Sequence, residues 1–264
     1  MVILITGISS GFGKAMAERL SREGHKVYGT YRKVQDPLPG VTYLKADVRS
    51  DEDARAAVQA VLDAEGRIDA FISNAGMGIG GPLEFCSLDA AREQMDTNWM
   101  GMVRFLHFVL PAMRKQRSGK ILCFSSIGGL MGLPFQGLYS ASKFAIEGYC
   151  EALRLEVRGF GINVILIEPG DFATSFTASR RSVPDAEAFE AYKSYRDSLA
   201  SIEKDETGGL KPEYLAAKIY RILRKKRPAY SYVIATFEQR LSVTLKKLLP
   251  PRWFAAILSG YYKL

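Results

Sequence analysis

Tyr139 and Lys143 stand four residues apart in the run Tyr139-Ser-Ala-Ser-Lys143, inside a stretch of helical pattern. On a helix, residues at this spacing lie on one face and can reach each other. A free phenol has a pKa near ~10, too high for proton exchange at neutral pH, and a nearby ammonium favours the phenolate. We therefore expect Lys143 to lower the pKa of Tyr139 and make it a general acid or base. An ordinary helix pair is the alternative interpretation.

Two other polar positions strengthen this expectation. Ser126 ends the apolar run Ile121-Leu-Cys-Phe-Ser-Ser126, and the ends of such strands are where ligands bind in α/β proteins. Asn98 lies early in a long helical pattern, and a buried amide there would need hydrogen-bond partners. We expect both side chains near Tyr139.

A glycine-rich turn, Thr6-Gly7-Ile8-Ser9-Ser10-Gly11-Phe12-Gly13, follows the first apolar strand and opens the first helix. Glycines permit a tight turn and close approach of the backbone to a pyrophosphate, and the helix N-terminus supplies N–H groups and positive dipole. The turn therefore predicts a dinucleotide site.

The end of the second predicted strand indicates which dinucleotide. NAD sites usually carry an acid there for the ribose 2′-hydroxyl, whereas NADP sites place an arginine near the 2′-phosphate. This chain reads Thr30-Tyr31-Arg32-Lys33, without an acid. We expect Arg32 to bind the phosphate, with Ser10 as a hydroxyl donor and Lys33 as distant support. A solvated basic turn is the alternative.

Short apolar runs alternate with longer helical patterns, which is typical of a doubly wound parallel sheet of the Rossmann type with helices on both faces. About seven strands are expected, at roughly 2–6, 26–31, 41–45, 69–73, 119–125, 162–168 and 230–235. Helices are expected at 12–23, 51–65, 88–117, 138–158 and 211–226. We expect one catalytic domain over 1–236 and a helical C-terminal tail over 237–264.

In combination, these motifs resemble the single-domain branch of the short-chain dehydrogenase/reductase family over about residues 1–235. The matching motifs are TGxxxGxG at 6–13, Asp47-Val48, Asn74-Ala75-Gly76, Asn98, Ser126, YxxxK at 139–143, and Pro169-Gly170 with Thr174. Segments 28–32 and 168–172 resemble those of hydroxysteroid- and retinol-dehydrogenase-like reductases. Ser73 and Phe12 are minor departures from the family pattern.

The resemblance implies roles for the catalytic positions. Tyr139 would donate the proton during reduction, Ser126 would bind the substrate oxygen, and Lys143 would hold the nicotinamide ribose and tune Tyr139. Asn98 would anchor a water linked to Lys143. The family spacing of 139 − 126 = 13 residues selects Ser126 over Ser125.

The same resemblance and the motifs above give an expected set of NADP(H)-binding residues. They are Gly7, Ser9, Ser10, Gly11, Phe12, Gly13, Tyr31, Arg32, Asp47, Val48, Asn74, Ala75, Gly76, Tyr139, Lys143, Pro169, Gly170, Phe172 and Thr174. No metal site is expected.

The substrate is expected to be hydrophobic. Apolar residues precede Tyr139 at 128–133, and residues 171–208 are expected to form a substrate lid, or else a surface excursion. Within it, Phe189, Tyr192, Tyr195 and Leu199 recur at helical spacing, which suits either helix packing or a pocket wall. We predict an NADP(H)-dependent oxidoreductase acting on a steroid-, retinoid- or lipid-like alcohol, ketone or aldehyde. The alternative is an NADP(H)-binding sensor or scaffold without turnover.

The net charge of +8 is concentrated near the C-terminus, since residues 209–264 carry 12 Lys/Arg and 2 Glu. In the tail, Trp253, Phe254, Ile257, Leu258, Tyr261 and Tyr262 form a helical face flanked by Lys246, Lys247, Arg252 and Lys263. Such a helix suits an anionic membrane, or docking on the protein's own surface or on a partner subunit. No motif for reading nucleic acid accompanies the charge.

The sequence also leads to expectations about the oligomeric state and the cellular location of the protein. The family resemblance implies a homodimer or homotetramer formed through the helices at 88–117 and 138–158. The start at Met1-Val-Ile-Leu-Ile leaves no room for a signal peptide, and three scattered cysteines suggest no disulfide framework. A cytoplasmic protein, with membrane contact through the tail as an open alternative, is expected.

Overall fold

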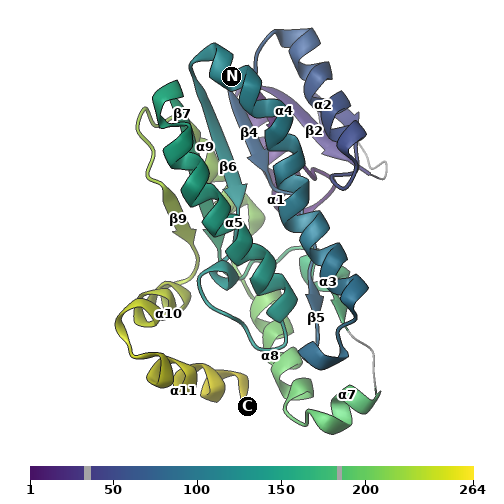
Figure 1. The fold of residues 1–264 in the computed structure, drawn as a ribbon, viewed down its shortest axis with the longest axis vertical. Coiled ribbons are helices and arrows are strands. Elements are labelled where there is room, and N and C mark those ends of the chain that lie inside the picture. The colour runs from purple at the N-terminus through teal and green to yellow at the C-terminus, as the bar shows by residue number, and fades with distance from the viewer. Residues whose placement is uncertain (33–36, 183–185) are drawn as a thin grey trace.

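The computed structural model describes residues 1–32, 37–182 and 186–264, and within them a seven-stranded parallel sheet forms the centre. The strand order is β3-β2-β1-β4-β6-β7-β9 (Figure 1). The strands are β1 (Val2–Ile5), β2 (Lys26–Tyr31), β3 (Val41–Lys45), β4 (Ala70–Ser73), β6 (Gly119–Phe124), β7 (Ile162–Pro169) and β9 (Ser231–Ile234). The inner strands are buried on both faces, as their continuous apolar runs require. The predicted fold class is confirmed.

Helices cover both faces of this sheet. One face is covered by α1 (Gly11–Arg22) and α9 (Pro212–Leu223), and the other by α2 (Asp51–Glu65), α4 (Gly101–Gln116) and α5 (Gly137–Glu156). Each layer buries its own apolar cluster, with Met16 and Ile219 on the first side and Phe105 and Cys150 on the second. Short 3₁₀ turns at Leu83–Phe85, Ile127–Gly129 and Arg158–Phe160 complete the connections.

The region expected as one helix over 88–117 is divided in the structure. It consists of α3 (Leu88–Met95), a π-helical turn (Asp96–Met100) and α4. A π-helical turn is rare and frequently marks a functional site. Here it contains Asn98, so the departure from a regular helix falls at a predicted catalytic position.

Residues 171–208, expected to form a lid or a surface excursion and called the lid below, consist of several short elements. The lid contains α6 (Phe176–Ser179), β8 (Arg181–Ser182), α7 (Ala186–Ala191) and α8 (Tyr195–Thr207). β8 pairs in parallel with β5 (Ile79–Gly80), which forms a second, two-stranded sheet that the sequence analysis did not anticipate. This small sheet ties the lid to the segment that follows β4.

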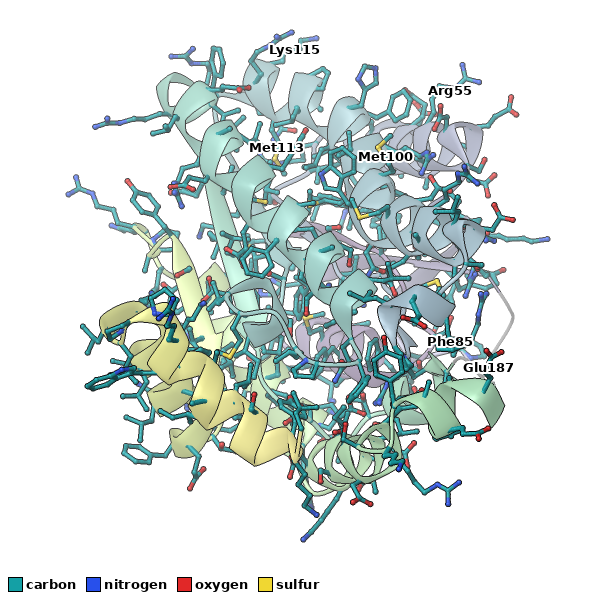
Figure 2. All side chains as sticks on the ribbon, turned by 60° about the horizontal axis from the view of Figure 1, so that its bottom comes forward. Arg55, Phe85, Met100, Met113, Lys115 and Glu187 are labelled. Carbon is teal, nitrogen blue, oxygen red and sulfur yellow. The ribbon has the colours of Figure 1, made fainter. Side chains whose placement is uncertain are left out.

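The tail forms two helices, α10 (Phe237–Leu248) and α11 (Pro251–Tyr262), joined at the expected break. The side chains of Thr236 and Gln239 form a capping box at the start of α10. α11 packs against α8, so that the tail and the lid lie together at one end of the molecule (Figures 1 and 2). Among the described residues, no helix is long and apolar enough to cross a membrane.

Candidate active site

The strand order reverses between β1 and β4, and a cavity of about 320 Å³ opens beyond the carboxyl ends of these strands. Ligands of open α/β sheets bind at such a point. The predicted site residues on its wall are Gly7, Ser9, Ser10, Gly11, Phe12, Tyr31, Arg32, Val48, Asn74, Ala75, Gly76, Ser126, Tyr139, Lys143, Pro169, Gly170, Phe172 and Thr174. Gly13, Asp47 and Asn98, which we also predicted, lie outside the wall.

The glycine-rich turn brings backbone groups close together at the entrance to α1. A Cβ added to Gly13 would lie 2.0 Å from the Gly7 carbonyl oxygen, and one added to Gly7, whose φ is +73°, would lie 3.0 Å from Ala75. The Asn74 Nδ2 donates to the carbonyl oxygens of Thr6 and Gly7 at 2.9 and 3.0 Å. The Ser10 side chain caps no N–H of α1. This cradle fits a pyrophosphate against the helix N-terminus.

The end of β2 contributes Tyr31 and Arg32 to the mouth of the cavity. Arg32 is exposed, and its charge helps to lower the pKa of Asp47, behind the larger effect of the hydrogen bonds from Arg49. A guanidinium at this position can grip a phosphate. Lys33, the expected distant support, lies outside the described residues.

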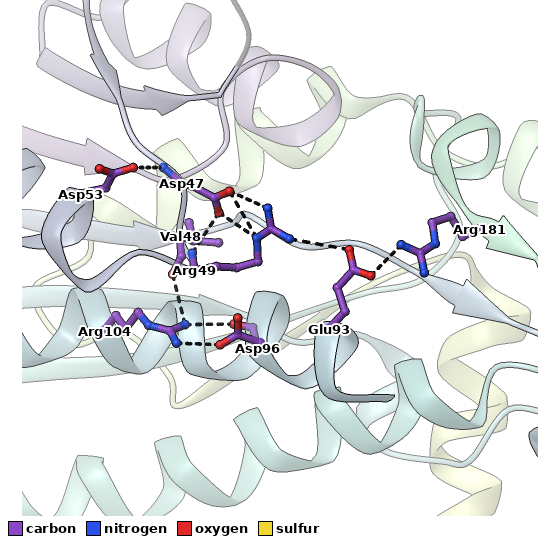
Figure 3. Close-up of polar contacts among 8 residues, drawn as sticks. All are labelled: Asp47, Val48, Arg49, Asp53, Glu93, Asp96, Arg104 and Arg181. Carbon is purple, nitrogen blue, oxygen red and sulfur yellow. Dashed lines mark hydrogen bonds and ion pairs between the residues drawn. The ribbon is translucent and has the colours of Figure 1, made fainter. Parts of the chain in front are cut away.

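A chain of polar contacts connects the loop after β3 with the lid (Figure 3). Arg49 Nη2 donates to Asp47 Oδ2 at 2.7 Å, and Arg49 Nη1 lies 3.7 Å from Glu93 Oε1. Arg181 of β8 donates to the other oxygen of Glu93 at 2.6 Å. Asp47 therefore belongs to the structural support of the cavity edge rather than to its wall.

Tyr139, Ser126 and Lys143 meet at the centre of the cavity. Lys143 is buried, and its Nζ donates to the Phe124 carbonyl oxygen at 2.8 Å while lying 5.5 Å from the centre of the Tyr139 ring. Ser126 accepts a bond from the Gly128 N–H at 3.1 Å, which fixes its hydroxyl. A tyrosine, a serine and a lysine thus share one partly enclosed space.

The pKa values in this group differ from the expectation. Burial, with smaller contributions from the charges of Glu206 and Asp171, raises the pKa of Tyr139 to about 12 against an opposing hydrogen bond with Ser126. Burial also lowers the pKa of Lys143 to about 8. The expectation that Lys143 lowers the pKa of Tyr139 is therefore wrong for this structure. Loss of solvent is the largest cause of both pKa shifts.

Asn98 lies behind the cavity wall and holds neighbouring backbone in place. Its Oδ1 accepts from the Met77 N–H at 2.8 Å, and its Nδ2 donates to the Met77 carbonyl and to Ser142 Oγ at 3.0 Å. Ser142 Oγ in turn donates to the Tyr139 carbonyl at 2.7 Å. This chain joins the π-helical turn to the first turn of α5, which carries Tyr139.

The lid end of the cavity combines apolar and charged side chains. Leu133, Phe172, Phe176 and Ile202 supply apolar surface, as expected for a hydrophobic substrate. The aromatic stripe of the lid does not line the cavity. Its Tyr195 ring packs on Phe135 and stacks on Phe189, at centroid distances of 4.9 and 4.8 Å. Helix packing is thus the correct interpretation of the stripe.

Two carboxylates on the same wall were not predicted. Asp171 directly follows the Pro169-Gly170 motif, and Glu206 comes from α8. Burial raises the pKa of Asp171 to about 7 and also raises the pKa of Glu206. The position of Asp171 beside a motif glycine was a usable signal, whereas nothing near Glu206 in the sequence indicated its place.

The tail also reaches the cavity. Tyr262 is buried and lines the wall, and its carbonyl accepts a bond from Ser198 Oγ at 2.5 Å. Gln239 of α10 donates from Nε2 to Asp171 Oδ2. The sequence analysis did not foresee any contribution of residues 237–264 to the site.

Comparisons with known proteins agree with this geometry. A family model described as short chain dehydrogenase matches residues 1–185. The chain belongs to the short-chain dehydrogenase family. Members of this family are oxidoreductases that bind nicotinamide cofactors and act on small molecules.

Individual relatives cover nearly the whole chain. A 3-ketodihydrosphingosine reductase from Bacteroides thetaiotaomicron is 46% identical, over 99% of this chain and 97% of its own. The human 17-beta-hydroxysteroid dehydrogenase type 1 is 38% identical, over 88% of this chain and 76% of its own. A short-chain dehydrogenase from Streptomyces avermitilis superposes with a TM-score of 0.81 at 26% identity, covering 99% of this chain and 96% of that one.

Proposed function

We propose that this chain is an NADP(H)-dependent reductase of a long-chain, lipid-like ketone or aldehyde, with Tyr139 as the general acid. The observation that carries the proposal is the meeting of Tyr139, Ser126 and Lys143 in the cavity that also contains the glycine cradle. A nicotinamide cofactor bound there would supply the hydride. The remaining chemistry falls to the chain's own residues.

In this mechanism the Ser126 hydroxyl holds the substrate oxygen while the Tyr139 hydroxyl donates its proton to that oxygen. A pKa of about 12 keeps the phenol protonated at neutral pH, so the proton that reduction consumes is present on Tyr139. Lys143, whose pKa is lowered to about 8, replaces the proton and holds the cofactor ribose. Asn98 positions the backbone of Met77 and, through Ser142, the start of α5.

The preference for NADP(H) rests on Arg32. It stands at the mouth of the cavity, and the segment Thr30-Tyr31-Arg32 ends β2 without an acid that would favour NAD(H). The remaining predicted cofactor contacts on the wall surround the same space. Gly13 supports the turn from behind, because any side chain there would collide with Gly7.

The substrate class rests on the cavity wall and on the relatives. Leu133, Phe176 and Ile202 offer apolar surface beside Tyr139. Relatives over most of the chain act on a sphingoid ketone and on steroids by name. The 46% identity over almost the full chain favours the lipid ketone.

We further propose that residues 1–236 form the catalytic domain and that the tail attaches it to an anionic membrane. On α11, Trp253, Ile257 and Tyr261 are 67%, 50% and 56% exposed, whereas Phe254 and Tyr262 on the adjacent face are buried. The tail also carries exposed cations at Lys246, Lys247, Arg252 and Lys263, although the Lys246 ammonium lies over the ring of the buried Phe254. A basic helix with outward aromatic residues binds the interface of anionic bilayers.

The membrane proposal is tested by sedimentation with vesicles that contain phosphatidylserine or only phosphatidylcholine. The wild type should sediment with the anionic vesicles, and the double variant Trp253→Ser, Ile257→Ser should remain in the supernatant. Equal behaviour of the two proteins would refute the assignment of this face.

We also propose a homodimer or homotetramer through α4 and α5, where a groove includes His107, Leu110 and Tyr149. Light scattering on the eluting protein measures the mass.

The catalytic proposal is tested by following loss of reduced-nicotinamide absorbance with NADPH or NADH and a panel of lipid ketones. We expect turnover that prefers NADPH and that is lost in Tyr139→Phe while NADPH binding persists. Tight NADPH binding without turnover of any ketone would instead support the alternative function, an NADP(H)-binding sensor or scaffold. Full activity of Tyr139→Phe would refute the assignment of the acid.

A further inference from the structure

Two carboxylates converge on the substrate end of the cavity, beside the hydroxyl that would protonate the carbonyl. Asp171 leaves the end of β7 and Glu206 projects from α8, and both line the wall that contains Tyr139. Both charges act on Tyr139, and the charge of Glu206 also acts on Asp171. These effects require the three groups to be neighbours, because charge interactions weaken with distance and solvent.

The protein binds only one oxygen of each carboxylate. Gln239 Nε2 donates to Asp171 Oδ2, while Thr177 Oγ1 donates to Glu206 Oε2 at 2.6 Å and Arg180 Nη2 donates to the same oxygen. Within residues 1–32, 37–182 and 186–264, no hydrogen bond reaches Asp171 Oδ1 or Glu206 Oε1. One acceptor oxygen of each acid therefore remains available at the cavity.

When both acids are ionised, their two negative charges exceed the single positive charge of Arg180. Arg180 forms an ion pair with Glu206, and Asp171 has no cation within bonding distance among the described residues. The Arg180 side chain is only 3% exposed and points to Glu206, yet its Nε and Nη1 have no partner. Burying unpaired charge destabilises a fold. An ion pair with a purely structural role would consist of Arg180 and Glu206 alone. It does not explain why a second acid, Asp171, lies beside them.

We propose that Asp171 and Glu206 form a cation subsite that binds a substrate ammonium group close to the reacting carbonyl. This inference rests on the proposed reductase function. Tyr139 marks where the carbonyl oxygen lies, so a cation held by its two acidic neighbours belongs a few bonds away. The ligand is a long-chain amino ketone, with its chain against Leu133, Phe176 and Ile202.

A cation between the acids supplies what the protein lacks. Its N–H groups can donate to Asp171 Oδ1 and Glu206 Oε1, and its charge offsets the excess negative charge. Because this end of the cavity is poorly solvated, charge-assisted bonds there are stronger than on the surface. A neutral ketone of the same length would leave both oxygens without a partner, and the subsite would select against it.

The experiment compares two ketones with NADPH. One is 3-ketodihydrosphingosine, a long-chain ketone with an amine beside the carbonyl, and the other is the hydroxy ketone of equal length that lacks the amine. We expect the wild type to prefer the amino ketone by roughly tenfold or more in kcat/KM. In Asp171→Asn and Glu206→Gln this preference should fall toward one, through a higher KM for the amino ketone.

Controls separate the possible outcomes. Glu203→Gln removes a charge from the exposed side of α8 and should keep the full preference. Glu206→Gln leaves Arg180 without its partner, so melting temperature and NADPH binding are measured for each variant; Asp171→Asn, nearly equal in shape, retains the bond with Gln239. Turnover of both ketones with a preference unchanged in Asp171→Asn would overturn the cation subsite alone. No turnover of either ketone by the wild type would overturn the reductase function and the subsite with it.

Discussion

Replacing Asp171 by asparagine should stabilise the protein, and by an amount that depends on pH. In the fold, burial raises the pKa of this carboxyl from 3.8 to about 7. Between these two values the folded state binds more protons at Asp171 than the unfolded chain does. The free energy of unfolding therefore falls as pH rises through this window, and the loss is complete above pH 7.

The size of the effect follows from the two pKa values. They differ by about 3, and one pKa unit corresponds to about 1.4 kcal/mol, so the full cost of the charge is roughly 4 kcal/mol. Partial exposure of the side chain and relaxation around the charge reduce this, and we expect roughly 1–3 kcal/mol. For a chain of this size, that corresponds to roughly 2–9 °C in melting temperature.

The assay is thermal unfolding of the wild type and Asp171→Asn at pH 5, 6, 7, 8 and 9. The melting temperature of the variant relative to the wild type should rise from pH 5 to pH 8 and then remain constant. Glu203→Gln serves as the control for loss of one acid and should show no such rise. If the difference in melting temperature between Asp171→Asn and the wild type does not change with pH, the ionised carboxylate of Asp171 does not destabilise the fold. The same conclusion follows if the relative stability of the variant falls as pH rises.

Two further changes test the cofactor side of the site, and a third tests the support that Asn98 gives behind the cavity wall. Arg32→Asp should lower the kcat/KM preference for NADPH over NADH by about 10–100-fold, since a charge-assisted bond contributes about 1.5–3 kcal/mol; an unchanged preference would assign the phosphate to another group. Gly13→Ala should abolish NADPH binding, because the new Cβ would lie 2.0 Å from the Gly7 carbonyl oxygen. Titration calorimetry measures the affinity, and a normal affinity would contradict the role of the glycine-rich turn in NADPH binding. Asn98→Ala should lower the free energy of unfolding in urea by roughly 1–3 kcal/mol, because the Met77 N–H loses its acceptor, whereas the Met77 carbonyl keeps its bond from Gln94. No change in stability would show that Asn98 does not hold this segment in place.

The sheet and the position of the glycine-rich turn at the cavity were predictable from sequence. Strands such as Ile162–Pro169 are buried over nearly their whole length, so apolar runs and βα alternation suffice to identify them. The glycine turn was recognisable because Gly7 and Gly13 occupy positions where a Cβ would collide with backbone. Such constraints are local and leave a local signature.

The substrate half depends on contacts between distant segments. Glu206 faces Tyr139 from 67 positions along the chain (206 − 139 = 67), and only the packing of α8 places it there. For a related reason, the predicted direction of the pKa change at Tyr139 was wrong. Spacing identifies Lys143 as a neighbour, but the loss of solvent that dominates both pKa values depends on the whole cavity.

The tail shows why an aromatic pattern alone could not choose between docking and membrane contact. Residues at 253, 257 and 261 share one face of α11, and those at 254, 258 and 262 share the adjacent one. The inner set closes the cavity through Tyr262 and packs beside Met131 and Val243, whereas the outer set remains exposed. One helix therefore carries both an exposed aromatic face and the residue Tyr262 that lines the cavity, and only the structure separates these two roles.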